Sequence, residues 1–347
     1  MSSGEDRRPL LLGAADVARL FDLDTGLASQ REAFGRLGRG EADQPARLVL
    51  PVSREGPGGS RGGPPEHRDE SLAFCYAARL APGSGAVSKF GSVNPANAAA
   101  GRPTVSATVL VLDPDDGRLV AIVEGTTLTA LRTSAASALA ASLLARPGAT
   151  TAAVLGPGVQ GRGHVRALAH ALLLEEVRLW GRDGAATGRV AADLDREVGP
   201  RVVAAGSVAE AVAGVDVVAA CTASPSPLVE AEQLAPGATV ISIGSITPDR
   251  SEVGLGVLAA AGTVVVDHRP AAVDHAGPVI QALAAGLLGE ADLVELGEVA
   301  AGRHPGRRGP DELVFYNSLG LGVQDAAAAW AIVERARTLG VGRRVAL

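Results

Sequence analysis

Lysine is almost absent from this chain of 347 residues: Lys89 is the single lysine among 32 basic side chains, and all the others are arginine. An ammonium group is compact and can lose its proton when its surroundings favour the neutral form, whereas a guanidinium stays charged. That difference matters in catalysis and rarely on a surface. Lys89 is therefore a candidate catalytic residue, and the alternative is a lysine that has survived by chance.

Aromatic residues make up only 3% of the chain, and cysteine occurs twice, at Cys75 and Cys221. An aliphatic core of Val, Leu and Ala must therefore hold the fold together. The two cysteines lie far apart and form no CxxC pair, and no histidines stand at metal-ligand spacing. We expect reduced thiols, a cytoplasmic protein and no metal site.

Long apolar runs are also missing: none reaches the roughly 18 residues that a membrane-spanning helix needs. The N-terminus lacks the apolar core of a signal peptide. Net charge is −6 and the sequence pI is about 5.6, so no basic field points to nucleic acid. We expect neither a membrane nor a nucleic acid as partner.

The first 127 residues have the pattern of a mostly antiparallel sheet with one leading helix. We expect this helix over 14–37 and strands at 10–12, 47–52, 72–80 and 104–112. Asp115-Asp116-Gly117 is a hairpin turn signal, because glycine tolerates positive φ. Residues 53–70 are rich in Gly, Pro and charge, which predicts a loop.

Beyond residue 127 short β-branched strands alternate with helices, which indicates parallel strands joined by crossovers. The expected strands lie at 151–155, 177–180, 202–204, 217–220, 239–243 and 263–266, and a last helix at 323–338. The predicted fold class is α/β, a Rossmann doubly wound parallel sheet plus an α+β domain. We expect residues 128–322 to form this parallel-sheet domain, apart from residues 1–127 and 323–347.

A glycine loop follows the strand at 151–155: Gly156-Pro157-Gly158-Val159-Gln160-Gly161 is GxGxxG between a strand and a helix. The first glycine makes the tight turn, the second lets the backbone approach a pyrophosphate, and the third allows close helix packing. The helix N-terminus then offers free N–H groups to the phosphates. The loop predicts a dinucleotide site, against the alternative of an ordinary glycine-rich turn.

The end of the next strand selects between NAD and NADP. An NAD site places an acid there for the ribose 2′-hydroxyl, but here Gly181 stands at that position and Arg182 follows. A cation suits a 2′-phosphate, so NADPH is favoured and NADH is the alternative. Asp183 could still turn inward and take the acid's place.

Several motifs occur together along the chain. Lys89 precedes Asn94-Pro95-x-Asn97, the string LTALRTSAASALAA covers 128–141, and Asn317-Ser318-x-Gly320-x-x-x-x-Asp325 comes late. With the glycine loop, these pieces resemble the ornithine cyclodeaminase/μ-crystallin family over roughly residues 45–340.

The resemblance implies that residues 128–322 bind the dinucleotide, and that residues 1–127 with 323–347 bind substrate and form the contact of a homodimer. It also implies a substrate that is a small amino or imino acid. It implies that Arg47, Lys89 and Arg132 bind the substrate carboxylate and poise the reacting carbon. A guanidinium grips a carboxylate bidentately, and we expect the two arginines to lower the pKa of Lys89. The expected cofactor contacts are Thr104, Thr133, Gly156, Gly158, Val159, Gln160, Arg182, Thr222, Ser318 and Gly320.

The chain departs from the family at one turn. Cyclodeaminases carry an aspartate two residues before the proline of a Gly-x-Asp-x-Pro turn, but the stretch here is Gly244-Ser245-Ile246-Thr247-Pro248. Isoleucine can neither accept a proton nor pair with an ammonium. Asp249 or Glu252 could replace the missing acid.

We therefore expect an NAD(P)H-dependent oxidoreductase that transfers a hydride at the Cα–N bond of an amino or imino acid. One alternative is an amino-acid cyclodeaminase, a lyase that uses the nicotinamide catalytically and regenerates it. The other is a crystallin-like protein that binds the cofactor without turnover.

Overall fold

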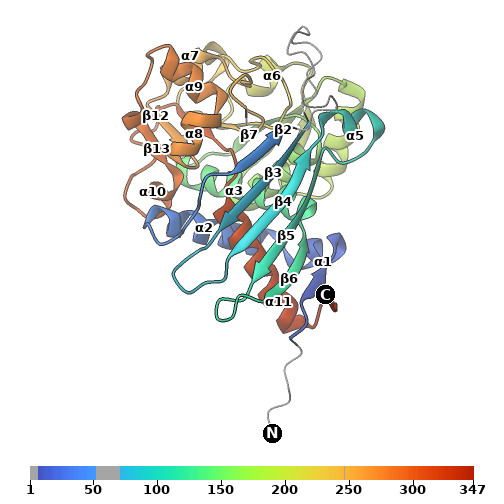
Figure 1. Cartoon of the computed structure of the whole chain (residues 1–347). Coiled ribbons are helices and arrows are strands. Elements are labelled where there is room, and N and C mark those ends of the chain that lie inside the picture. The colour runs from blue at the N-terminus through green and yellow to red at the C-terminus, as the bar shows by residue number, and fades with distance from the viewer. Residues whose placement is uncertain (1–6, 52–70, 246) are drawn as a thin grey trace, which may run out of the picture. The chain divides into compact units, whose positions relative to one another are not determined.

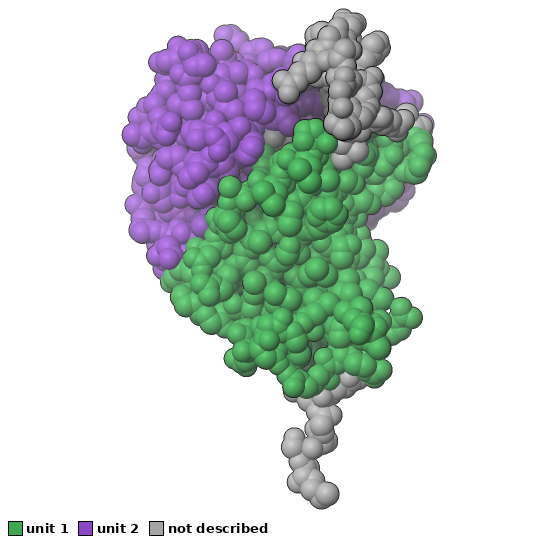
Figure 2. All heavy atoms as spheres, viewed as in Figure 1, with its two compact units in different colours: residues 1–22, 41–129, 322–347 green, residues 23–40, 130–321 purple. Residues whose placement is uncertain are grey.

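The computed structural model describes residues 7–51, 71–245 and 247–347, so the expected loop at 53–70 and Ile246 lie outside the described residues. The chain forms two compact units, shown in green and purple in Figure 2. Unit 1 comprises residues 1–22, 41–129 and 322–347, and unit 2 comprises 23–40 and 130–321. The observed units differ from the expected division mainly at 23–40, which belong to unit 2.

Unit 1 is built on a seven-stranded sheet in the order β15-β1-β6-β5-β4-β3-β2. All its neighbours are antiparallel except β1 and β6, which are parallel. The strand β4, which carries Lys89, was not expected from the sequence. The strands are β1 (Leu10–Leu12), β2 (Leu48–Pro51), β3 (Leu72–Ala78), β4 (Val87–Val93), β5 (Val105–Leu112), β6 (Leu119–Glu124) and β15 (Arg343–Arg344).

The two faces of this sheet have different surroundings. Because side chains alternate along a strand, the row Tyr76–Lys89–Val109 points to one face and the row Cys75–Phe90–Thr108 to the other. Helix α11 (Gly322–Leu339) packs on β3, β4 and β5 (Figure 1). Lys89 and Val109 are buried, whereas 60% of Phe90 is exposed. The covered face is therefore the one that carries Lys89.

The single helix expected over 14–37 is wrong. Two helices stand there, α1 (Ala14–Leu20) and α2 (Leu23–Gly38), because Phe21 leaves the helical region with φ −116° and ψ 72°. Helix α2 packs on α10 (Leu296–Ala300), and a Cβ on Gly38 would lie 1.9 Å from the carbonyl oxygen of Gly297. This close contact places α2 in unit 2.

Unit 2 holds an eight-stranded, wholly parallel sheet in the order β13-β12-β14-β11-β10-β7-β8-β9. The predicted α/β doubly wound class is confirmed, although β13 and β14 were not expected. The strands are β7 (Thr151–Leu155), β8 (Glu176–Trp180), β9 (Arg201–Ala204), β10 (Val217–Ala220), β11 (Thr239–Ser242), β12 (Thr263–Val266), β13 (Leu293–Glu295) and β14 (Val314–Asn317).

Helices flank this sheet. Helix α3 (Gly125–Leu144) begins in unit 1 and continues into unit 2, and no helix of the described residues is long and apolar enough to cross a bilayer. Besides α2 and α10, unit 2 contains the helices α4 (Val159–Ala171), α5 (Gly184–Asp195), α6 (Val208–Val212), α7 (Leu255–Ala260), α8 (Arg269–His275) and α9 (Gly277–Ala284).

The strand order reverses direction between β7 and β10: the chain runs from β7 outward to β8 and β9, then returns to build β10, β11 and β14 on the other side. Ligands of open parallel sheets bind outside the carboxyl ends of the strands at such a switch point. The fold therefore places the candidate site of unit 2 at the loops that follow β7, β10, β11 and β14.

Candidate active site

The glycine loop after β7 is built around two very close approaches. Gly156 has φ +104°, and a Cβ there would lie 2.7 Å from the carbonyl oxygen of Cys221 in the loop after β10. A Cβ on Gly161 would lie 1.7 Å from the carbonyl oxygen of Gly156. Only glycine fits at either position, so the loop can fold back tightly under the start of α4.

The N-terminus of α4 is open to a ligand. Its N-cap residue, Gly158, supplies no side-chain cap, and Val159, the first helical residue, is 73% exposed. The Oε1 atom of Gln160 is buried and has no hydrogen-bond partner among the described residues. Free N–H groups at a helix start suit a diphosphate, so these residues fit a dinucleotide.

The end of β8 carries the residues expected to select the cofactor. Gly181 is buried, and a Cβ there would lie 2.5 Å from Cδ of Pro157. Arg182 is exposed. The Asp183 carboxylate accepts a hydrogen bond of 2.9 Å from the backbone N–H of Ala186 and caps α5. Asp183 is therefore engaged as a helix cap, which leaves Arg182 as the group at this strand end that suits a phosphate.

Lys89 forms a buried ion pair in unit 1. Its Nζ lies 2.6 Å from Oδ2 of Asp325 on α11, and both side chains are 2% exposed. Nζ also donates to Oγ1 of Thr129 at 3.4 Å. It lies 5.0 Å from the ring centre of Tyr76 and 5.6 Å from that of Phe74. A carboxylate, a hydroxyl and two aromatic faces thus hold the amine in a fixed position.

Arg47 approaches the same aromatic group. One of its terminal nitrogens donates to the Tyr76 hydroxyl at 3.4 Å, so Arg47 and Lys89 both contact Tyr76. The structure therefore brings together two of the three residues expected to bind the substrate. The sequence did not lead us to expect the carboxylate of Asp325 that lies directly against Lys89.

Arg132, the third expected substrate residue, lies on α3 in unit 2 and is 6% exposed. Its charge acts on Asp267, the residue after β12. Burial raises the pKa of Asp267 overall, although its hydrogen bonds and, to a smaller extent, the charge of Arg132 lower it. A Cβ on Gly320, which has φ +83°, would lie 2.8 Å from the Arg132 guanidinium. A larger residue at position 320 would have a strained backbone at this positive φ and would contact the Arg132 side chain, so the position favours glycine.

Asp267 fixes the loop that contains Gly320. Its Oδ2 accepts from the backbone N–H groups of Leu319 at 2.8 Å and Gly320 at 2.7 Å, and its Oδ1 accepts from the Tyr316 hydroxyl. These contacts connect the ends of β12 and β14 beside Arg132. The carboxylate therefore orders the loop and offers Arg132 an opposite charge.

Glu252 is fully buried and accepts four hydrogen bonds. Thr222 donates its backbone N–H and its hydroxyl, each at 2.7 Å, while Ser242 donates its hydroxyl at 3.0 Å and Gly244 its N–H at 2.6 Å. Burial raises the pKa of Glu252 to about 7, although all four donors favour the ionised form. Glu252 thus ties the loop after β10 to the loop after β11, whereas Asp249 is exposed.

The remaining residues predicted to contact the cofactor differ in exposure and in their hydrogen bonds. Thr104 is exposed and lies in unit 1, whereas the glycine loop lies in unit 2. Thr133 is 7% exposed on α3, and Ser318 is 2% exposed and donates its N–H to the carbonyl oxygen of Ser242. The Thr222 hydroxyl is engaged with Glu252.

The sequence pattern did not single out Asp325, Tyr76 or Asp267, which lie beside the predicted site residues. Asp325 was noticed only as part of a motif, and its contact with Lys89 joins residues 236 positions apart. Asp267 had a usable signal, because an acid directly after the apolar strand TVVV falls at the carboxyl edge of a parallel sheet.

The parallel sheet, its switch point and the glycine loop define a Rossmann-type dinucleotide-binding protein. Residues 8–339 match the ornithine cyclodeaminase/mu-crystallin family, and the chain belongs to that family. The protein is an NAD(P)-dependent oxidoreductase of the kind that acts on CH–NH groups.

Three relatives illustrate the similarity. Ketimine reductase mu-crystallin of Mus musculus is 35% identical over 233 residues, which is 67% of this chain and 70% of the relative. The structure of Thermococcus litoralis Delta(1)-pyrroline-2-carboxylate reductase with NADH and L-proline has a TM-score of 0.89 at 27% identity, covering 97% of this chain and all of the other. An archaeal alanine dehydrogenase dimer with bound NAD has a TM-score of 0.86 at 27% identity, covering 98% and 99%.

Proposed function

We propose that the protein reduces the C=N bond of a small imino acid, or oxidises the corresponding amino acid in reverse. The buried pair of Lys89 and Asp325 carries this proposal, because reduction of an imine requires a proton at nitrogen as well as a hydride at carbon. NAD(P)H, when bound, supplies the hydride. The named activities of the ketimine and pyrroline-2-carboxylate reductases support the same reaction.

Each residue has a distinct proposed role. Lys89 holds a proton at Nζ and delivers it to the substrate nitrogen. Asp325 acts through Lys89, as a positioning residue that keeps the amine charged and oriented. Arg47, which contacts Tyr76, binds the substrate carboxylate. Arg132, whose charge acts on Asp267, is also assigned to binding this carboxylate.

The turn at residues 244–248, which differs from the Gly-x-Asp-x-Pro turn of cyclodeaminases, favours a reductase over a cyclodeaminase. The acid expected in a cyclodeaminase is replaced by Ile246, and the buried acid nearest in sequence, Glu252, is engaged in four hydrogen bonds. Both oxygens of this carboxylate already accept hydrogen bonds from backbone N–H groups and hydroxyls. We therefore propose that Glu252 does not act on the substrate.

A cofactor-oxidation screen tests this function. The panel contains pyrroline-2-carboxylate, piperideine-2-carboxylate, and pyruvate with ammonia or methylamine, and both cofactor absorbance and ammonia release are followed. Net loss of NADPH with at least one cyclic or open-chain imine is the expected result. Ammonia release from ornithine without net cofactor change would establish a cyclodeaminase. Tight cofactor binding with no turnover over the panel would support a crystallin-like role.

For the cofactor we propose NADPH, with NADH as the alternative. The exposed Arg182 at the end of β8 and the engagement of Asp183 as a helix cap support NADPH. The solved relatives named above hold NADH or NAD. Because a 2′-phosphate is the single difference between the two cofactors, the choice depends on Arg182.

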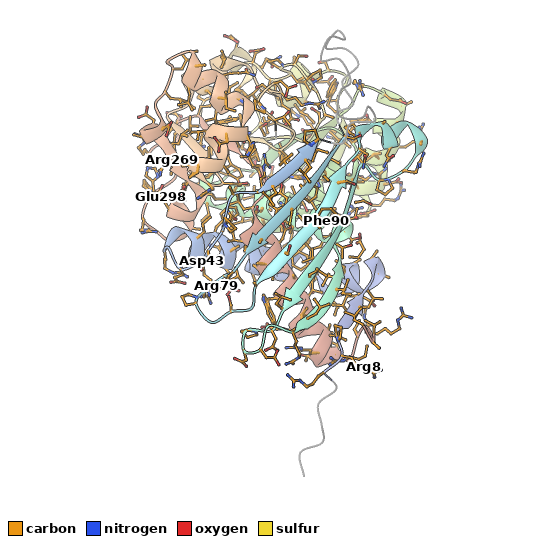
Figure 3. The ribbon with its side chains drawn as sticks, in the orientation of Figure 1. Arg8, Asp43, Arg79, Phe90, Arg269 and Glu298 are labelled. Carbon is orange, nitrogen blue, oxygen red and sulfur yellow. The ribbon has the colours of Figure 1, made fainter. Side chains whose placement is uncertain are left out.

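We propose a homodimer that forms through the open face of the unit 1 sheet. Leu48, Leu50 and Phe90 are 60–67% exposed there, and Leu110 is 39% exposed. Figure 3 shows Phe90 on β4 at the front of this sheet. Large apolar side chains exposed on one face of a sheet are typical of a protein interface. The free thiols Cys75 and Cys221 fit the cytoplasmic location that we also propose.

A further inference from the structure

We propose that Asn317 binds the carboxamide of the nicotinamide ring. The inference deepens the proposed function, since it rests on the use of a nicotinamide cofactor. Asn317 is the last residue of β14 and is 1% exposed. Both polar atoms of its side chain, Oδ1 and Nδ2, lack a hydrogen-bond partner within the described parts of the chain.

Such a side chain is costly to keep without a partner. Each buried polar group left unsatisfied destabilises the folded state, so a buried amide with two free groups points to a ligand. The neighbouring residue on β11 does not supply the missing hydrogen bonds. Ser242, which pairs with Asn317 across β11 and β14, uses its hydroxyl on Glu252 and Ser245.

The position of Asn317 in the sheet selects the nicotinamide end of the cofactor. The glycine loop for the diphosphate follows β7, and the expected ribose selector follows β8, so the adenosine half of the cofactor belongs to β7, β8 and β9. The strands on the other side of the switch point are β10, β11 and β14. Asn317 ends β14 at the carboxyl edge of this second half.

Two more buried polar atoms without partners occur at the same edge. Oε1 of Gln160 lies in the first turn after β7, and Oγ1 of Thr247 lies in the loop after β11. Strands β7, β11 and β14 are all parallel, so the segments that follow them lie at one edge of the sheet. This edge therefore presents unsatisfied polar groups on both sides of the switch point, as a dinucleotide site would.

The chemistry of an amide fits the carboxamide. An asparagine side chain offers one acceptor and an N–H₂ donor, and a carboxamide offers the complementary donor and acceptor. Two such hydrogen bonds would give Oδ1 and Nδ2 of Asn317 a partner each. The nicotinamide ring is shared by NADH and NADPH, so Asn317 recognises the reactive ring and leaves the choice between the two cofactors to Arg182.

Direct binding measurements test the assignment without any turnover. Dissociation constants are measured for NADP⁺, for its 3-acetylpyridine analogue, which keeps the carbonyl but lacks the amide N–H₂, and for 2′-phospho-ADP-ribose, which lacks the ring. The wild-type protein should bind NADP⁺ about tenfold tighter than the analogue. In Asn317→Ala this ratio should fall to about one, while affinity for 2′-phospho-ADP-ribose stays within about twofold.

Asn317→Leu, which keeps the branched shape of the side chain, should behave in the same way. Thr239→Val is the matched control, because Thr239 is fully buried at the opposite end of β11 and should leave the ratio unchanged. The inference is overturned if wild-type protein does not discriminate against the analogue, or if the Asn317 variants lose 2′-phospho-ADP-ribose in parallel with NADP⁺. Failure of the wild-type protein to bind any of the three ligands would instead refute the proposed function, and the inference with it.

Discussion

Lys89 is held in the interior of unit 1 by a partner that the sequence does not place beside it. The amine and the Asp325 carboxylate are 2.6 Å apart and almost fully shielded from water. Removing one member of a buried pair leaves an uncompensated charge and typically costs about 3–5 kcal/mol. This cost explains why the two charges occur together in the interior.

Lys89→Arg should preserve the fold and the affinity for NADPH but lower turnover at least about a hundredfold, because a guanidinium does not release a proton. Steady-state rates with the best imine from the screen and a separate binding titration measure the two effects. Arg79→Lys is the matched control, since Arg79 is exposed and paired with Asp43 (Figure 3). Unchanged turnover in Lys89→Arg would show that Lys89 is incidental.

Glu252 gives a stability effect with a defined sign. Burial raises its pKa from 4.5 to about 7, so between these values the folded protein binds the proton more tightly than the unfolded chain does. The free energy of unfolding should therefore fall as pH rises through this window, by up to about 3 kcal/mol.

Denaturant unfolding of wild-type protein and Glu252→Gln between pH 4.5 and 7.5 isolates this contribution. Burial lowers the pKa of His164 to about 4 and produces the opposite slope in an overlapping range, but this slope is common to both proteins. The difference between the two curves should fall with rising pH. Parallel curves would show that Glu252 keeps its ordinary pKa.

At the scale of elements, the loop between β8 and α5 determines cofactor choice in our account. Arg182→Ala should weaken NADPH at least about tenfold, because it removes a charge-assisted contact, and leave NADH within about twofold. Arg189→Ala, an exposed arginine on α5, is the control. Fluorescence titrations with the two cofactors give the affinities, and equal losses for both would refute the 2′-phosphate role.

The sequence predicted most elements that have a regular pattern. Six strands of the parallel sheet and the glycine loop were found because apolar β-branched runs and GxGxxG are local signals. Strand β4 was missed because Lys89, Gly91 and two serines interrupt the alternation of apolar and polar residues. The folded structure requires glycine at position 91, because a Cβ there would lie 2.5 Å from the carbonyl oxygen of Ser106 on β5.

The candidate site was less predictable than the fold. Lys89 and Arg47 could be chosen from composition and resemblance, but their partners Asp325 and Tyr76 come from other strands and helices. The unsatisfied amide of Asn317 is likewise a property of packing. Such contacts depend on which residues the folded chain brings together, and no local pattern records them.

At the scale of the whole molecule, the open face of the unit 1 sheet should hold two copies together. Phe90→Glu should convert the dimer to monomers at micromolar concentration, because it places a charge in the middle of an apolar interface. Leu173→Glu is the control, since Leu173 is 92% exposed in unit 2, outside this sheet. Sedimentation velocity gives the masses, and a Phe90→Glu protein that remains a dimer would place the interface elsewhere.

Hydride transfer to carbon is the central claim, and isotopic labelling tests it most directly. The protein is incubated with NADPH that carries deuterium at C4 of the nicotinamide ring, on each face in turn, and with the imine that it turns over best. We predict that one of the two labelled forms gives an amino acid with one deuterium on its α-carbon, in equal amount to the NADPH consumed. An unlabelled product from both forms would contradict the account.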